Sequence, residues 1–358
     1  MPQQNLNHAP LKGRGVSRDL PNRFRQEWWE LEPGEEPSNE TELIEDHSAS
    51  ILSVNTSPDV PFRLGVNPYR GCAHGCVYCY ARPSHEFLGY SPGLDFERKI
   101  VFKPRAAELL REALGKRSYR PEVIALSGNT DCYQPVERRL ELTRRCLEVL
   151  AESRNPTAVI TKSALVARDT DLLGELASHG ACGVTFSITS LDPELSGLLE
   201  PRASRPARRL QAMRALHEAG VPVGVLIAPV IPGLNDHEIP AILEAAGAAG
   251  ATRAGWILLR LPGAVEPLFQ EWLETQLPTK RDKVLDRLRA TRGGKLHEGA
   301  FGQRMRGTGP YAQQLEQLFT LARKRAGIEP GEAPPLSGAA FRKPTRDGTR
   351  QLPLFGEG

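Results

Sequence analysis

The sequence predicts an α/β protein whose centre is a partial (β/α)6 barrel, with a helical C-terminal extension and disordered termini. Between residues 56 and 265, short and nearly continuous apolar segments alternate with amphipathic segments of helical period, which is typical of parallel βαβ units. The alternation gives about six units, fewer than the eight of a closed barrel. An open doubly wound sheet is the alternative arrangement of the same elements.

The expected elements follow in order along the chain. Strands are predicted at 62–67, 122–128, 157–162, 183–190, 222–231 and 254–262, and helices at 104–116, 137–153, 169–180, 205–220 and 238–250. Three further helices are predicted at 266–276, 278–292 and 310–327. The sequence therefore divides into a largely irregular segment 1–55, the barrel 56–265, a helical region 266–328 and a disordered tail 329–358 that is rich in Pro and Gly.

Composition excludes several classes of protein. The chain has 358 residues, 40% of them hydrophobic, which is enough for a substantial core, and its formal net charge is +3. The first residues contain no apolar segment of signal-peptide type, and no run approaches the roughly 18 apolar residues of a membrane span. We therefore expect a cytoplasmic protein without a membrane segment, whose clustered cysteines serve metal binding or catalysis.

Three of the six cysteines lie in "GCAHGCVYCY", on the loop that follows the first predicted barrel strand. Such loops form the reactive face of parallel α/β folds. Cys72, Cys76 and Cys79 could bind three irons of a [4Fe-4S] cluster and leave the fourth iron open to another ligand. A structural zinc site completed by His74 or His85 is the alternative, although the sequence has no second C-x-x-C pair.

These motifs carry a family resemblance. "CAHGCVYCY" followed by six βα units resembles the radical S-adenosylmethionine (SAM) enzymes over residues 60–265. "NPYRGCAHGCVYCYARP", "GNTDCYQPVE", "VITKS" and "TFSITSLDPELSGLLEPRAS" are similar to the spore photoproduct lyase branch, also called DNA repair photolyase-like. The resemblance implies a [4Fe-4S] cluster, SAM bound at its open iron, a 5′-deoxyadenosyl radical that abstracts hydrogen from the substrate, and lyase or DNA repair chemistry on DNA. It also implies an electron donor such as flavodoxin or ferredoxin.

The same resemblance implies which residues contact SAM. Tyr78 would lie near the adenine, Thr130 and Asp131 at the methionine end, Lys162 at the carboxylate, and Ser187 at the ribose or methionine. Each residue also has an ordinary structural alternative: loop packing for the tyrosine, an Asx turn for the Thr-Asp pair, a solvated lysine, and a serine bonded to backbone.

The sequence departs from the lyase branch at one position. In that branch the cysteine that returns hydrogen to the product radical lies three positions before the aspartate of the motif, where Gly128 stands in this chain. Cys132, directly after Asp131, is the candidate catalytic hydrogen donor instead, whereas Cys146 and Cys182 are expected in the core. The departure puts lyase chemistry itself in question.

The partner could be a nucleic acid. Arg202, Arg205, Arg208 and Arg209 follow the fourth strand and could contact phosphates near the barrel mouth, or form only a basic helix start. Modification of RNA or of a peptide is a second possibility within the enzymes, and a zinc-bearing nucleic-acid adaptor without turnover is the alternative from another class.

The last residues suggest a protein partner. "RQLPLFGEG" places Gln351, Leu352, Leu354 and Phe355 in an otherwise polar tail. The stretch looks like the peptide by which bacterial replication and repair proteins bind the sliding clamp, with the two apolar side chains at the end filling a pocket. Back-folding onto the barrel is the alternative.

Overall fold

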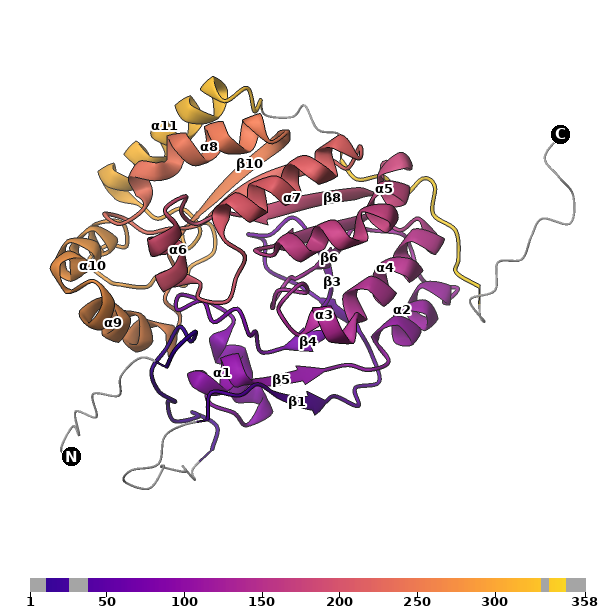
Figure 1. Ribbon diagram of the computed structural model, residues 1–358, viewed down its shortest axis with the longest axis horizontal. Coiled ribbons are helices and arrows are strands. Elements are labelled where there is room, and N and C mark those ends of the chain that lie inside the picture. The colour runs from indigo at the N-terminus through magenta and orange to yellow at the C-terminus, as the bar shows by residue number, and fades with distance from the viewer. Residues whose placement is uncertain (1–10, 26–37, 330–334, 346–358) are drawn as a thin grey trace, which may run out of the picture.

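A seven-stranded sheet forms the centre of the computed structural model, which describes residues 11–25, 38–329 and 335–345 (Figure 1). The strands lie in the order β10-β9-β8-β7-β6-β3-β2. They are β2 (Leu52–Val54), β3 (Leu64–Val66), β6 (Ile124–Leu126), β7 (Thr157–Thr161), β8 (Cys182–Ser187), β9 (Val223–Val230) and β10 (Ala251–Leu258). All neighbours from β3 to β10 are parallel, and only β2 pairs antiparallel, with β3.

The strand order confirms the partial (β/α)6 barrel. A doubly wound sheet reverses its strand order at a switch point. Here each new parallel strand is added on the same side of the previous one, so the six units wind in one direction. The strands read as apolar because both faces are covered: Val66, Leu126, Val159 and Phe186 are all fully buried in one core.

Helices cover the outer face of the parallel strands (Figure 1). They are α2 (Ala106–Gly115), α4 (Leu142–Ser153), α5 (Thr170–Ser178), α7 (Pro206–Glu218) and α8 (Ile239–Ala248). The short helix α6 (Pro193–Leu199) packs instead with the cysteine loop. The C-terminal helix α11 (Gly309–Arg325) packs beside α8. A Cβ on Gly247 would lie 2.6 Å from the carbonyl oxygen of Ala326, so this close approach requires glycine.

The helix predicted over 137–153 is two helices. α3 (Glu137–Leu140) ends at Glu141, whose φ of 50° is left-handed, and α4 begins at the next residue. The buried Glu137 carboxylate accepts hydrogen bonds from Thr143 N at 3.0 Å and from Tyr69 Oη at 2.5 Å. It thus caps the start of α4 from the preceding turn, which composition alone does not reveal.

The N-terminal segment is more regular than predicted. β1 (Glu42–Glu45) pairs in parallel with β5 (Lys99–Phe102), and β4 (Tyr69–Arg70) pairs antiparallel with the other edge of β5. This three-stranded sheet and α1 (Leu94–Arg98) lie below the main sheet in Figure 1. Tyr69 and Ile100 are fully buried, so the small sheet has an apolar centre of its own.

The helical region after the barrel packs near the cysteine loop. It contains α9 (Val265–Gln276), a 3-10 turn at Pro278–Lys280 and α10 (Arg281–Ala290). The helix predicted from residue 278 therefore begins three residues later. Phe269, Trp272 and Leu285 belong to the same hydrophobic cluster as Val77 and Tyr78, so this region supports the loop that carries the cysteines.

Part of the tail that was predicted to be disordered is fixed to the barrel. Ser337 N donates to Gly180 O, and Arg342 N donates to Ser153 O, each at 2.9 Å. Thr345 N donates to Glu152 Oε1, also at 2.9 Å. Residues 335–345 thus cover the edge of the helical layer.

Two sequence expectations concern the chain ends and the membrane. The proposed clamp-binding residues Gln351, Leu352, Leu354 and Phe355 lie outside the described residues. Within the part of the chain that the structure describes, every helix is too short or too polar to cross a membrane.

We expect a chain ending at residue 329 to be about 2 kcal/mol less stable to urea than the full chain, because it loses the hydrogen bonds made by residues 335–345. A chain ending at residue 345 is the control and should match the full chain. Equal stability of all three would show that the tail contacts add nothing to the fold.

Candidate functional site

A cavity of about 560 Å³ opens at the carboxyl ends of the parallel strands. Its walls come from the β2–β3 segment, from the cysteine loop, and from the carboxyl ends of β6 to β10 with the residues that follow β6, β7 and β10. The predicted cofactor residues meet there: Cys72, Cys76, Tyr78, Cys79, Thr130, Asp131, Lys162 and Ser187. The volume lies in the range of small-molecule sites.

Two glycines give the cysteine loop its shape. Gly71 and Gly75 have φ values of 75° and 70°, in the left-handed region. A Cβ on Gly71 would lie 2.9 Å from Lys99 O, and one on Gly75 would lie 2.7 Å from a carboxylate oxygen of Glu97. The loop can therefore curl closely against α1 and β5 only because both residues lack side chains.

A buried ion pair holds the loop in place. Arg82 and Glu97 are both fully buried, and Arg82 Nη2 lies 2.5 Å from Glu97 Oε1. The same guanidinium donates to Cys76 O at 2.9 Å and to Gly93 O at 2.9 Å. It thus binds the loop by its backbone and leaves the sulfurs free for a ligand.

The N-terminal segment lies directly on this loop. Gly15 N donates to Glu97 Oε2 at 3.0 Å, and a Cβ on Gly15 would come within 1.7 Å of Gly75 O. Val16 packs with Cys76 and Tyr78 in one hydrophobic cluster. The loop is therefore covered on its outer side and open towards the cavity.

The chemistry of the three cysteines suits a metal cluster. Burial raises the pKa of the Cys72, Cys76 and Cys79 thiols, so in the metal-free chain they are protonated, and binding of a cluster would release these protons. In the described ranges, no three His, Cys, Asp or Glu side chains are placed to hold one metal ion. In a cubane cluster each thiolate binds a different iron atom. The three sulfur atoms can therefore lie farther apart than the ligands of a single zinc ion.

Neither histidine of the zinc alternative is placed as a ligand in this arrangement. His74 is buried, with Nδ1 3.4 Å from Asp131 Oδ2, and burial lowers its pKa. His85 packs against Tyr90 and Phe96, at ring distances of 5.3 and 5.6 Å.

Asp131 is held between two strands. Its carboxylate accepts hydrogen bonds from Thr161 Oγ1 at 2.8 Å and from Lys162 N at 2.7 Å, both at the end of β7. It also accepts one from Tyr133 N at 2.9 Å, which is the Asx turn considered as its structural alternative. Thr130 Oγ1 donates to Tyr69 O at 2.7 Å. These bonds fix the Thr-Asp pair at the cavity wall.

Lys162 reaches across the cavity floor. Its Nζ donates to Ser187 Oγ at 2.5 Å and to Ala228 O at 3.2 Å, and lies 3.9 Å from Glu200 Oε1. Its side chain is 16% exposed, so the ammonium is neither a solvated surface group nor sealed in the core. One positive charge therefore stands between the ends of β7, β8 and β9, beside the cysteine loop.

Glu200, to which the sequence assigned no role, is the centre of this network. It accepts hydrogen bonds from Thr189 Oγ1 at 2.6 Å, from Tyr78 Oη and from Arg209 Nη2. Burial alone would raise its pKa, but the charges of Arg209 and Lys162 and these hydrogen bonds lower the pKa to about 2. The carboxylate is thus a permanent negative charge that joins the cysteine loop to β8 and α7.

Cys132 is not brought to the cavity. It is 1% exposed and belongs to the main core, where its backbone N donates to Ser127 Oγ at 2.8 Å and its carbonyl accepts from Thr143 Oγ1 at 2.6 Å. The role of Cys132 as a hydrogen donor stays a prediction, and its burial in the core does not favour that role. Cys146 and Cys182 are buried in the same core, as expected.

The four arginines that the sequence suggested as a basic patch do not form one exposed surface. Arg209 is buried against Glu200, and Arg205 donates to Pro193 O. Arg202 Nη1 lies 3.3 Å from Thr41 Oγ1, so of the four only Arg208 is exposed with no partner beyond its own helix in the described residues. The sequence could not show this, because a charge run gives no sign of which members face inward.

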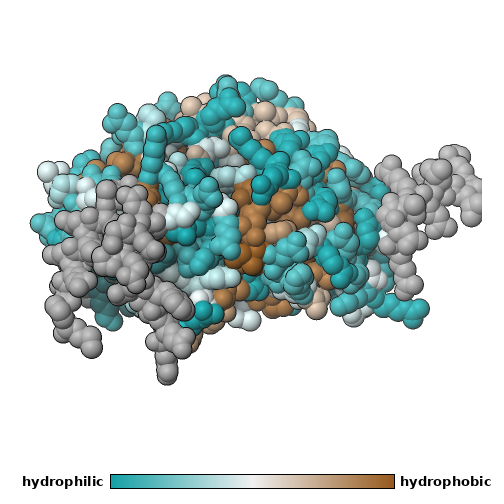
Figure 2. Space-filling model, turned by 60° about the horizontal axis from the view of Figure 1, so that its bottom comes forward, coloured by the Kyte–Doolittle hydropathy of each residue, from teal (hydrophilic) through white to brown (hydrophobic). Residues whose placement is uncertain are grey.

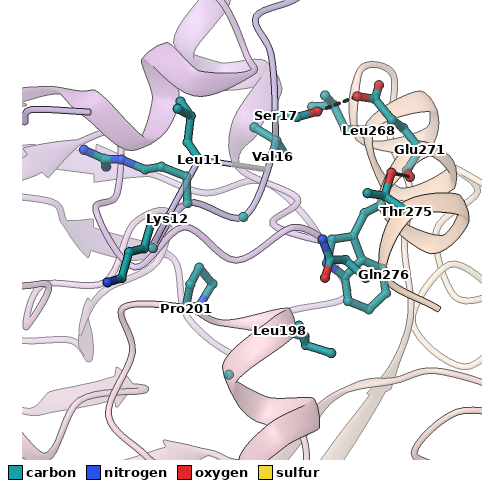
Figure 3. A pocket seen from close by; sticks show the side chains of 15 residues that line it. Leu11, Lys12, Val16, Ser17, Leu198, Pro201, Leu268, Glu271, Thr275 and Gln276 are labelled. Carbon is teal, nitrogen blue, oxygen red and sulfur yellow. Dashed lines mark hydrogen bonds between the residues drawn. The ribbon is translucent and has the colours of Figure 1, made fainter. Parts of the chain in front are cut away.

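A smaller cavity of about 200 Å³ lies between the N-terminal segment, α6 and α9 (Figure 3). Ser17 Oγ donates to Glu271 Oε1 at 2.5 Å across it, and Leu198 and Leu268 point into it. None of the predicted site residues lines this space. Figure 2 shows one face of the molecule, on which hydrophobic surface gathers in a hollow near the middle, surrounded by hydrophilic side chains.

Comparisons with known proteins agree with this geometry. The family model described as "Radical SAM superfamily" matches residues 66–246. An uncharacterized protein of Mycobacterium tuberculosis is 38% identical over 232 residues, which are 64% of this chain and 68% of that protein. An uncharacterized protein of Methanocaldococcus jannaschii is 31% identical over 173 residues, 48% of this chain and 62% of that protein.

Solved structures share the fold. Spore photoproduct lyase complexed with dinucleoside spore photoproduct has a TM-score of 0.57 at 17% identity, and the match covers 81% of this chain and 80% of that chain. A mutant of the same enzyme with bound AdoMet and dinucleoside spore photoproduct has a TM-score of 0.55, also at 17% identity, covering 81% and 79%.

We expect Glu200→Gln to lower the free energy of unfolding by about 3–5 kcal/mol, because it leaves the buried Arg209 guanidinium without its counter-charge. Adding Arg209→Met should recover much of this loss. Urea unfolding measures both effects, with the exposed Glu194→Gln as the control. A cost no larger than that of the control would show that Glu200 does not anchor the network.

Proposed function

Because the chain belongs to the radical SAM superfamily, we propose that it is a SAM-dependent radical enzyme that acts on DNA. The observation that carries the proposal is the single cavity at the carboxyl ends of the strands, which joins the three cysteines to Lys162 and Asp131. A cofactor that binds a metal cluster at one end and needs a carboxylate and an ammonium partner at the other fits this arrangement.

Enzymes of the family use a [4Fe-4S] cluster and SAM. Cys72, Cys76 and Cys79 are the residues of this chain that would hold the cluster, and they open to the cavity from one loop. When both are bound, the chemistry they would supply is the one-electron reductive cleavage of SAM to methionine and a 5′-deoxyadenosyl radical, which would abstract hydrogen from the substrate. The covering of the loop by the N-terminal segment and α9 would exclude water from this chemistry.

The charges around the cavity suit the amino-acid end of SAM. The Lys162 ammonium would bind the carboxylate, with Ser187 Oγ beside it, and Asp131 would accept hydrogen bonds from the ammonium. Tyr78 would contribute its ring and not its hydroxyl, because Glu200 and Thr189 already bind the hydroxyl. Its ring lies 5.8 Å from Lys162 Nζ, so the two residues form one wall.

DNA is the proposed substrate because the structurally similar spore photoproduct lyase carries a dinucleoside lesion in its complex. We do not propose the lyase reaction itself. Gly128 stands where the lyase branch has its hydrogen-donating cysteine, and Cys132 is buried in the core. The reaction proposed here is hydrogen abstraction from DNA, with an external reductant such as flavodoxin or ferredoxin.

The first test is SAM cleavage. Full-length protein, reconstituted with iron and sulfide without oxygen and then given dithionite and SAM, should form 5′-deoxyadenosine, which chromatography measures. Cys76→Ala is the control, because loss of one thiolate should prevent a complete cluster. A fully loaded wild-type protein that forms no more 5′-deoxyadenosine than this control would refute the radical enzyme.

A second test separates SAM binding from cluster binding. Lys162→Ala should weaken SAM binding about tenfold or more, because it removes the cation opposite the carboxylate, while the iron content stays that of the wild type. Equilibrium dialysis with labelled SAM and iron analysis measure the two effects. The exposed Lys280→Ala is the matched control, and loss of iron in Lys162→Ala alone would assign the lysine to the support of the loop.

A further inference from the structure

Arg260 is a further cation in the wall of the cavity, besides Lys162. It follows β10 by two residues, and it lines the same cavity as the cysteines. Its guanidinium lies 5.5 Å from the ring centre of Tyr80, and its Nη1 lies 3.7 Å from Met305 Sδ. Arg260 is therefore directed into the space where a substrate would meet the cofactor.

The guanidinium of Arg260 lacks an anionic partner. In the described parts of the chain, no carboxylate lies within the 4.0 Å of an ion pair, and its buried Nε has no hydrogen-bond acceptor. By contrast, the charged groups at the cofactor end, Lys162 and Asp131, are bonded within the protein. A half-buried cation without a partner loses hydration and gains little in return.

Neighbouring arginines increase the positive charge at this wall. Arg304 also lines the cavity and pairs with Asp59 and Ser57. Arg292 is 3% exposed, and burial together with the nearby charge of Arg260 lowers its pKa to about 10. Among the described residues, Asp59 is the carboxylate that forms an ion pair with any of these three guanidinium groups. The wall thus carries an excess of positive charge.

Arg292 also fixes the geometry of this wall. It donates to Leu259 O at 2.7 Å and to Arg304 O at 2.9 Å, the carbonyls of the residue before Arg260 and of Arg304 itself. The segments of Leu259 and Arg304, which are distant in the sequence, are thereby held side by side. The two guanidinium groups at the cavity wall are pre-organised and not the ends of free surface side chains.

We propose that Arg260, with Arg304 beside it, forms a phosphate-binding subsite of the cavity, which holds the backbone of a single DNA strand. The proposal rests on the proposed function, which supplies the nucleic-acid substrate. The planar guanidinium forms two parallel hydrogen bonds to phosphate oxygens. The half-exposed ring of Tyr80 next to it offers a face on which a base can stack, and a carboxylate ligand would make no use of such a face.

Two amide side chains that line the same cavity agree with a nucleotide. Asn67 Oδ1 accepts a hydrogen bond from Asn129 N at 3.0 Å, which fixes both residues at the cavity wall. Within the described residues, no hydrogen bond uses Asn67 Nδ2 or Asn129 Oδ1. A free amide donor and a free amide acceptor can meet the edge of a base.

The test is binding of a labelled single strand of about 12 nucleotides to the reconstituted full-length protein, followed by fluorescence anisotropy over a range of salt concentrations. Arg260→Ala should raise the Kd about five- to tenfold and reduce the slope of log Kd against log salt by about one, since one phosphate contact is lost. Arg260→Lys should recover part of the affinity, because it keeps the charge without the fork. The exposed Arg214→Ala, on α7 and outside the cavity, is the matched control and should bind like the wild type.

Three results would overturn the subsite. They are an unchanged salt slope in Arg260→Ala, an equal loss in Arg214→Ala, and displacement of the strand by a polyglutamate peptide as effectively as by an unlabelled strand. Iron content and urea unfolding of each variant exclude a folding defect. Because SAM cleavage is measured without DNA, a wild type that forms 5′-deoxyadenosine while Arg260→Ala binds normally refutes the subsite alone, and a wild type that forms none refutes the proposed function.

Discussion

The buried carboxylate of Glu200 is the interaction on which the arrangement of the cavity depends. It binds the hydroxyls of Tyr78 and Thr189, the guanidinium of Arg209 and, at 3.9 Å, the ammonium of Lys162. These groups come from the cysteine loop, the segment after β8, α7 and the end of β7. A charged group that is shielded from water needs hydrogen-bond donors and opposite charges around it. The position of the Glu200 carboxylate therefore determines where these side chains lie. The lysine that faces the cavity is thereby held at a defined place.

A second buried pair, Arg82 with Glu97, does the same for the cysteine loop. Because Arg82 binds backbone carbonyls and Glu97 binds the backbone of Gly15, the loop is fixed without using its thiols. The two pairs support neighbouring residues of the loop. Arg82 donates to the carbonyl of Cys76, and the next residue, Val77, donates its backbone N at 3.1 Å to the carbonyl of Leu199, which precedes Glu200. Buried ion pairs add little net stability, but they favour one conformation of the loop. A site that binds a cluster needs its cysteines fixed in one such conformation.

The sequence was sufficient for the features that repeat or that carry a short motif. The six parallel strands were predictable because each is an apolar run between helical segments, and the cysteines because three thiols occur within eight residues. Glu137 shows what could not be predicted. It begins one helix, its carboxylate caps the next through Thr143 N, and the same carboxylate accepts a hydrogen bond from Tyr69, a residue 68 positions earlier. The inward turn of Arg209 and the contacts of residues 335–345 with the barrel also depend on distant parts of the chain, which no local pattern records.

The side chains that line the cavity differ in whether their charges and hydrogen-bonding groups are paired within the protein. Lys162, Asp131 and Tyr78, which we propose as SAM contacts, bind one another or Glu200, so this part of the cavity is pre-organised. By contrast, Arg260 and the amides of Asn67 and Asn129, in the described part of the chain, retain unused hydrogen-bonding groups. A cofactor that all members of a family share can use a pre-formed site. The substrate differs between enzymes, and it must supply the partners for the charges and hydrogen-bonding groups that the protein leaves unpaired. The proposed substrate subsite therefore rests on the groups that the described part of the chain leaves unpaired.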